Sequence, residues 1–113
     1  MLFRYACLSL LLILLGVTHA ARADETELTP EYLSDPDHIA LGKELFAQQC
    51  AGCHGRRAYP GKAPRLKPKK LTPEDVYLRI TYGFRKMPAW EGVYTDEELM
   101  AITAYVKSDR FSN

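Results

Sequence analysis

Few residues in this chain can bind a metal or form a redox pair. The sequence holds three cysteines and three histidines among its 113 residues. Cys7 lies within the first 23 residues, which leaves Cys50 and Cys53 as the cysteines of the remaining chain. If both serve one site, no thiol remains for a structural disulfide. A zinc site, which needs about four protein ligands, would have to recruit both His38 and His54.

The chain also lacks an apolar run long enough to span a membrane. Its longest run, Tyr5–Leu15, is well short of the roughly 20 residues that a spanning helix needs. Arg4 precedes the run and Ala21-Arg22-Ala23 follows it, a pattern typical of an export signal. We therefore expect residues 1–23 to be a cleaved signal peptide, with cleavage after Ala20 as the alternative, and the mature protein to be periplasmic. No stable membrane insertion is expected after cleavage.

No excess of one charge marks the mature chain. Without residues 1–23 it carries thirteen basic and fourteen acidic residues, a net charge of −1, which argues against a nucleic-acid binder. The charge is nevertheless uneven. Seven basic residues and no acidic ones lie within residues 56–70; they are Arg56, Arg57, Lys62, Arg65, Lys67, Lys69 and Lys70.

The sequence shows no internal repeat and no alternation of strands and helices, and its patterns predict an all-α fold. Asp35 is a suitable N-cap for a helix that begins at Pro36 and ends at residues 50–54. Thr72 caps a second helix that stops at Gly83, and Thr95 with Glu98 forms the capping box of a third. Residues 55–70 and 84–94 read as loops. We expect a flexible arm over residues 24–34 and one domain over residues 35–113.

The segment Cys50-Ala51-Gly52-Cys53-His54 is a C-x-x-C-H motif, the sequence at which haem c is attached. A thioredoxin-like site would need a strand–helix–strand setting, which this chain lacks. A zinc site would need His38, which lies at the far end of the first predicted helix. The motif therefore predicts that Cys50 and Cys53 form thioethers with one haem and that His54 ligates its iron.

Methionine and histidine are the usual protein ligands for the sixth position of haem iron. Met87 lies in a predicted loop directly before Pro88, which stiffens the backbone. Met100 lies inside the last predicted helix, where a role in the core is expected, and His38 would require the first helix to lie across the iron. We therefore predict His54 and Met87 as the two axial ligands.

With these motifs the chain resembles the class I c-type cytochromes, in particular the small bacterial monohaem cytochromes c. The resemblance covers roughly residues 37–108 and rests on the haem motif, Pro64-Arg65-Leu66, residues 83–90 and the final helix. It implies the cytochrome c fold, with three to four short helices around one covalently bound haem. It also implies roles for single residues: Gly42 and Phe46 contact the last helix near Tyr105, the Pro64 carbonyl accepts a hydrogen bond from His54, Leu66, Leu78 and Ile80 pack on the porphyrin, and Trp90 lies near the propionates.

These assignments predict a one-electron carrier that is not an enzyme, because two side chains fill both axial positions of the iron. The expected partners are redox proteins: a periplasmic dehydrogenase, possibly a quinoprotein, as donor and an oxidase or another cytochrome as acceptor. The basic residues at 56–70 would either steer an acidic partner, balance the acidic termini in solvent or neutralise a propionate. We expect a monomer. The alternatives are a haem enzyme or a gas or peroxide sensor with a labile sixth ligand, and the haem subunit of a larger complex.

Overall fold

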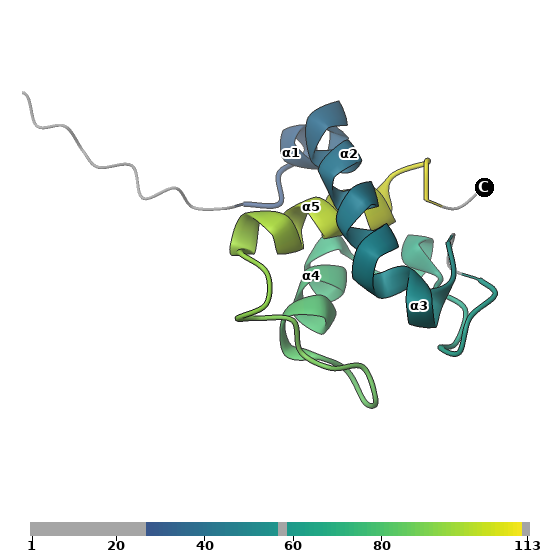
Figure 1. Cartoon of the computed structure of the whole chain (residues 1–113). Coiled ribbons are helices and arrows are strands. Elements are labelled where there is room, and N and C mark those ends of the chain that lie inside the picture. Colours follow the sequence, from purple (N-terminus) through teal and green to yellow (C-terminus); the bar gives the residue numbers. More distant parts are fainter. Residues whose placement is uncertain (1–26, 57–58, 112–113) are drawn as a thin grey trace, which may run out of the picture.

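The computed structural model describes residues 27–56 and 59–111. The predicted signal peptide and Arg57 lie outside the described residues. The helices are α1 (Pro30–Ser34), α2 (Pro36–Leu45), α3 (Ala51–His54), α4 (Pro73–Tyr82) and α5 (Asp96–Lys107), with a π-helical turn at Phe46–Cys50 and a 3₁₀ turn at Pro68–Lys70 (Figure 1). The described residues contain two isolated β-bridges but no strand. The predicted all-α fold is confirmed. None of the helices in the described ranges has the length and apolar character required to cross a bilayer.

The helix starts follow from local chemistry. The Asp35 carboxylate accepts hydrogen bonds from the backbone N–H groups of Asp37 (2.8 Å) and His38 (3.1 Å). At α4 the Thr72 hydroxyl and the Asp75 carboxylate each bind the other residue's backbone N–H, and Thr95 and Glu98 do the same at α5. Each capping box satisfies two N–H groups that the first helical turn leaves without partners. All three predicted helix starts are confirmed.

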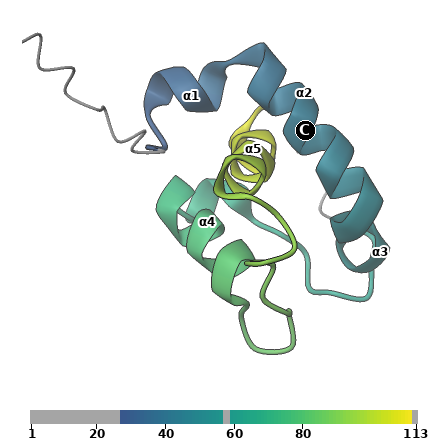
Figure 2. The ribbon, with the colours of Figure 1, turned by 60° about the vertical axis from the view of Figure 1, so that its left-hand side comes forward.

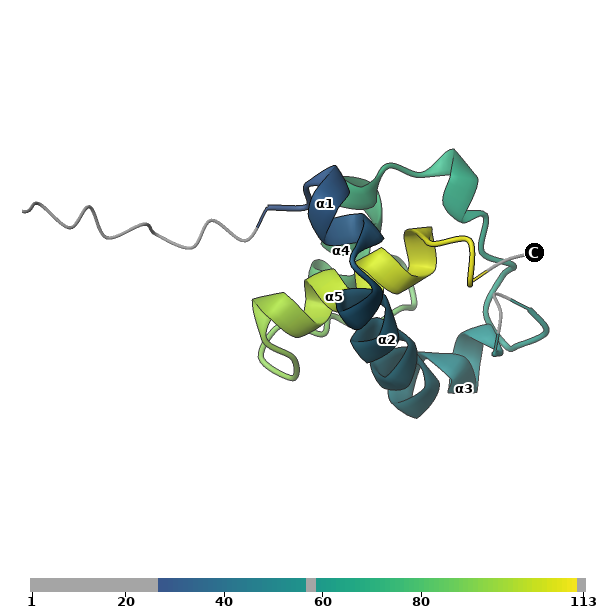
Figure 3. The ribbon, with the colours of Figure 1, turned by 90° about the horizontal axis from the view of Figure 1, so that it is seen from above.

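The centre of the molecule is the crossing of α2 over α5, and α5 lies between α2 and α4 (Figures 2 and 3). Gly42 of α2 approaches α5 so closely that a Cβ there would collide with the Ala101 carbonyl and lie 2.9 Å from the Tyr105 Cβ. The rings of Phe46 and Tyr105 meet edge to face at 5.6 Å, and Phe111 packs against both at 5.0 and 5.3 Å. The contact that the resemblance implies between Gly42, Phe46 and Tyr105 is confirmed.

The flexible arm expected over residues 24–34 is wrong for its second half. Residues 30–34 form α1, which begins where the Thr29 hydroxyl accepts a hydrogen bond from the Tyr32 N–H at 3.1 Å. The Tyr32 ring stacks on the His38 ring at 3.8 Å, and its hydroxyl donates to the Glu97 carbonyl at 3.2 Å. Such a short helix has little stability alone. It forms because contacts with the adjoining α2 and with α5, far along the sequence, hold it.

A π-helical turn joins α2 to α3. The Ala51 N–H donates to the Phe46 carbonyl five residues back, whereas a regular α-helix bonds four residues back. This turn ends at Cys50, so the haem motif begins inside it. Single π-helical turns occur frequently at functional sites, and the sequence period gave no sign of this one.

Candidate haem site

The C-x-x-C-H motif closes the α2–α3 run, and both of its cysteines are free thiols, Cys50 buried and Cys53 exposed. Burial, with a smaller contribution from Cys53, raises the pKa of the Cys50 thiol to about 11. Helix α3 stops at Gly55, whose φ of 76° favours glycine. The run therefore presents one thiol from inside the apolar core and the other from its surface, three residues apart.

His54 is half-buried at the end of α3, and its ring lies 6.5 Å from that of Phe46. Burial lowers the pKa of its imidazole, which favours the neutral form that ligates metals. Its Nδ1 is buried and finds no hydrogen-bond partner among the described residues. A buried polar atom without a partner costs free energy. In this surrounding the imidazole therefore has a ring nitrogen whose hydrogen-bonding capacity is not satisfied.

The hydrogen bond expected between His54 and the Pro64 carbonyl is not made among the described residues, since His54 Nδ1 has no partner there. The loop is instead tied to α3 by the Ala63 N–H, which donates to the Cys53 carbonyl at 2.8 Å, and Pro64 is exposed. At the other end of this loop the Lys107 ammonium donates to the carbonyls of Pro68 (2.7 Å) and Leu71 (2.6 Å). Both ends of the loop are therefore fixed, one to α3 and one to α5.

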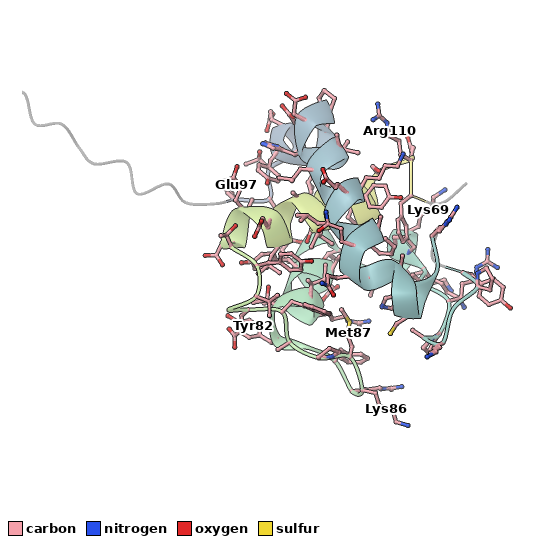
Figure 4. The ribbon with its side chains drawn as sticks, viewed as in Figure 1. Lys69, Tyr82, Lys86, Met87, Glu97 and Arg110 are labelled. Atoms are coloured by element: carbon pink, nitrogen blue, oxygen red, sulfur yellow. The ribbon has the colours of Figure 1, made fainter. Side chains whose placement is uncertain are left out.

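Met87 is presented by a two-residue turn. The Phe84 N–H donates to the Met87 carbonyl at 3.1 Å, and the Met87 N–H donates to the Phe84 carbonyl at 3.0 Å. Gly83, with φ of 81°, ends α4 as predicted and leads into the turn. Met87 is partly buried and packs on the core, and in Figure 4 its side chain extends from the turn toward α2 while Lys86 points away.

Trp90 and Tyr94 follow Met87 in the same loop, and their ring centroids lie 5.9 Å apart. The Trp90 N–H donates to the carbonyls of Ile80 (3.0 Å) and Thr81 (3.1 Å), which fastens this loop to the end of α4. Burial raises the pKa of Tyr94, with a smaller contribution from Cys50. Sequence reasoning missed Tyr94. Its position four residues after Trp90 and directly before the helix cap was the available signal.

Several of the predicted site residues belong to the apolar core or pack on it. Cys50, Val76 and Ile80 are buried in it, and Leu66, Met87 and Trp90 pack against it. Leu78, in contrast, is 50% exposed. A covalently bound porphyrin fits these residues. Two free thiols can attach it, the His54 imidazole has an unsatisfied nitrogen, and the apolar side chains nearby include the Met87 thioether. The residues present therefore fit haem c.

The rival sites find no support in the positions of the residues. His38 lies at the start of α2, about 18 Å along a helical rise from Cys50, and its Nδ1 lies 3.2 Å from the Tyr32 carbonyl. Within residues 27–56 and 59–111, no three His, Cys, Asp or Glu side chains gather as they would around a metal ion. His38 is thus a structural residue of the α1–α2 junction rather than a partner of the motif.

Comparison with known families gives one match over most of the described chain. Residues 37–106 match the family model described as cytochrome c oxidase, cbb3-type, subunit III. The match begins at the first turn of α2 and ends near the end of α5. It therefore contains the α2–α5 crossing, the C-x-x-C-H motif and the Met87 turn.

Individual proteins of known identity are similar to the same part of the chain. Cytochrome c6 of Euglena gracilis is 31% identical over 74 residues, which cover 58% of this chain and 85% of that protein. The cbb3-type cytochrome c oxidase subunit FixPc of Rhizobium leguminosarum is 34% identical over 84 residues, 66% of this chain but 29% of that protein. The similarity thus extends to small proteins of similar size and to a part of a larger subunit.

Solved structures share the fold. The cytochrome SorU of Sinorhizobium meliloti has a TM-score of 0.56 at 34% identity, covering 69% of this chain and 97% of that one. Cytochrome CL of the methylotroph Methylophaga aminisulfidivorans has a TM-score of 0.60 at 29% identity, covering 67% of this chain and 55% of that one. Both likenesses cover about two thirds of the chain.

Proposed function

The chain belongs to the c-type cytochrome family, as the match to the cbb3-type subunit III model shows, and we propose that it is a periplasmic one-electron carrier. Its cofactor is haem c and its role is electron transfer. In this proposal His54 and Met87 are the axial ligands. The haem supplies an Fe(III)/Fe(II) couple. The chain supplies two thioether attachments through Cys50 and Cys53, two axial ligands and a largely apolar pocket.

The observation that carries this proposal is that two segments far apart in the sequence both contact the same apolar core. Cys50 enters the core from the end of the α2–α3 run, and Met87 packs on it from the loop between α4 and α5. His54 follows the second thiol directly, so it would hold the iron of a haem attached at the motif. Met87, from the other segment, would supply the second ligand. Ligation by methionine stabilises ferrous iron and raises the reduction potential.

A redox titration with visible spectra tests the axial pair. Methionine-ligated ferric haem has a weak band near the red end of the visible spectrum, and the Met87→Ala variant should lose this band. Its reduction potential should fall, because ferrous iron loses its thioether ligand. A variant that keeps the wild-type band and potential would remove Met87 from the proposed site.

Met100 provides the matched control. It is a second methionine of the described chain, fully buried in α5 at 1% exposure. The Met100→Leu substitution approximately conserves volume and should cost less than about 1.5 kcal/mol of stability. It should leave both the band and the potential unchanged, because Met100 is a core residue in this proposal.

The partners follow from charge and from the family. The basic residues described at 56–70 are exposed and border the segment that carries His54. We propose that they steer an acidic redox partner, so the association rate should fall as ionic strength rises. A periplasmic dehydrogenase, including a quinoprotein, is the proposed donor, and an oxidase or another cytochrome the acceptor. A rate independent of salt would contradict the role of the cluster.

A further inference from the structure

Two guanidinium groups lie over the ring of Phe84, the first residue of the turn that presents Met87. The Arg79 Cζ of α4 is 4.3 Å from the ring centroid, and the Arg85 Cζ of the turn itself is 5.2 Å from it. A cation within about 6 Å of an aromatic face is attracted by the ring quadrupole. Phe84 is 44% exposed, so these two arginines rather than the core hold its ring.

The backbone of Phe84 is joined to the backbone of Met87. Both hydrogen bonds of the turn run between these two residues, at 3.1 and 3.0 Å. Gly83 adds a steric limit, because a Cβ there would lie 2.6 Å from the Met87 carbonyl oxygen and 3.0 Å from the Ala89 nitrogen. The position of Phe84 therefore determines where the Met87 side chain begins.

The turn itself is strained. Arg85 has a φ of 56°, in the left-handed region that residues other than glycine rarely adopt. Such a conformation persists only where the surrounding structure offsets its cost. The contact of the Arg85 guanidinium with Phe84 holds one side chain of the turn over another, and Arg79 fixes the same ring to α4.

We infer that Arg79 and Phe84 are positioning residues for the iron ligand Met87. The Arg79 guanidinium holds the Phe84 ring, and the ring holds a strained turn in the one conformation that aims Met87 at the haem. The inference rests on the proposed ligation by Met87. It assigns to Arg79 a role in keeping the sixth ligand bound, separate from any charge it offers to a partner.

Competition by imidazole for the ferric iron tests this role. Imidazole binds only where Met87 has left, so its apparent affinity rises with the fraction of protein that has released Met87. Arg79→Gln and Phe84→Leu each remove the contact, and each should bind imidazole about two- to fivefold more tightly than the wild type. The double variant should show less than the product of the two effects, because both substitutions break the same interaction.

Conservative variants separate positioning from folding. Phe84→Tyr keeps the ring and Arg79→Lys keeps the cation, so both should restore most of the wild-type affinity. Lys86→Gln is the charge-matched control, since it removes one positive charge from the same turn while its side chain points outward (Figure 4). It should leave imidazole affinity unchanged. An equal effect of Lys86→Gln and Arg79→Gln would show a general charge effect and overturn the inference.

The Met87→Ala variant distinguishes the proposed ligation by Met87 from the positioning role of Arg79 and Phe84. If it loses the red band while Arg79→Gln and Phe84→Leu bind imidazole as the wild type does, the positioning role is overturned and the proposed ligation stands. If it keeps the red band, the ligation and the positioning role both fail. Loss of the band in Met87→Ala together with tighter imidazole binding in both contact variants supports the inference.

Discussion

The α2–α5 crossing and the side that holds the haem motif and the Met87 turn differ in how well the protein buries its apolar groups and pairs its polar ones. At the α2–α5 crossing, Gly42 admits the close approach of α5, and the rings of Phe46, Tyr105 and Phe111 bury one another. On the side of the haem motif and the Met87 turn, the His54 Nδ1 is buried without a partner among the described residues, and Phe84 is 44% exposed.

This difference separates what makes the fold from what makes the site. At the crossing, the apolar side chains of the two helices are buried against other side chains of the protein. The haem side holds two free thiols, which fit the two attachments of one porphyrin, and a buried imidazole nitrogen without a hydrogen-bond partner among the described residues. Substitutions on the first side should therefore change stability, and substitutions on the second should change the cofactor and its properties.

The largest expected effect is on the attachment of haem. Replacement of both Cys50 and Cys53 by alanine should abolish covalent haem, because no other thiol of the mature chain remains to form a thioether. Haem staining after denaturing gel electrophoresis measures this directly. Cys7→Ala is the control and should stain like the wild type, since Cys7 belongs to the predicted signal peptide. Haem that stays attached to the double variant would contradict the assignment of the motif.

The second prediction concerns the crossing. Phe46 is 3% exposed and touches two other rings, so Phe46→Ala should lower the free energy of unfolding by about 3–5 kcal/mol. Denaturant titration of the holoprotein measures it. Val93, which is 62% exposed in the loop after Trp90, serves as control, and Val93→Ala should change stability by less than about 0.5 kcal/mol. Equal effects of the two substitutions on the free energy of unfolding would contradict the prediction that the crossing determines stability.

The smallest expected effect is a dependence on acid at the start of α2. The backbone N–H groups of His38 and Asp37 lower the pKa of the Asp35 carboxyl. Its contribution to stability is therefore present above the unfolded pKa of about 3.9 and is lost as the pH falls through the lower folded value. Asp35→Asn keeps the cap but does not titrate, so it should reduce the loss of stability below pH 4. Thermal unfolding of both proteins between pH 2 and 7 measures the difference, and identical acid profiles would refute it.

The helix ends could be predicted where residues within one short segment form the cap or the stop. Asp35, Thr72 and Thr95 cap their helices through bonds to residues two or three positions ahead, and Gly83 stops α4 with a positive φ. Helix α1 was missed although Thr29 and Pro30 offer the same local start as Thr72 and Pro73. Its five residues show no helical period of their own, and the hydrogen bond from Tyr32 to Glu97, 65 positions away, is not visible in a local pattern.

Within the site, the motif and the Met87 turn were recognisable because they carry their own chemistry in a few consecutive residues. The contact between Arg79 and Phe84 was not, because it needs the end of α4 to fold back against the turn. The hydrogen bond implied for Pro64 depends on the path of a whole loop. No short pattern in the sequence determines that path.

The π-helical turn at Phe46–Cys50 has a consequence for the length of the chain. Each residue of an α-helix rotates the following residues by about 100°. The π turn spans with five residues what an α-helix spans with four, so it absorbs one extra residue and leaves the direction of the following residues nearly unchanged. Deleting one residue between Phe46 and Cys50 should therefore restore α-helical bonding and keep both cysteines and His54 facing the core. Deleting one residue between Gly42 and Leu45, where the helix is regular, should instead rotate the motif by about 100° relative to the crossing. Haem staining of the two deletion variants would compare them.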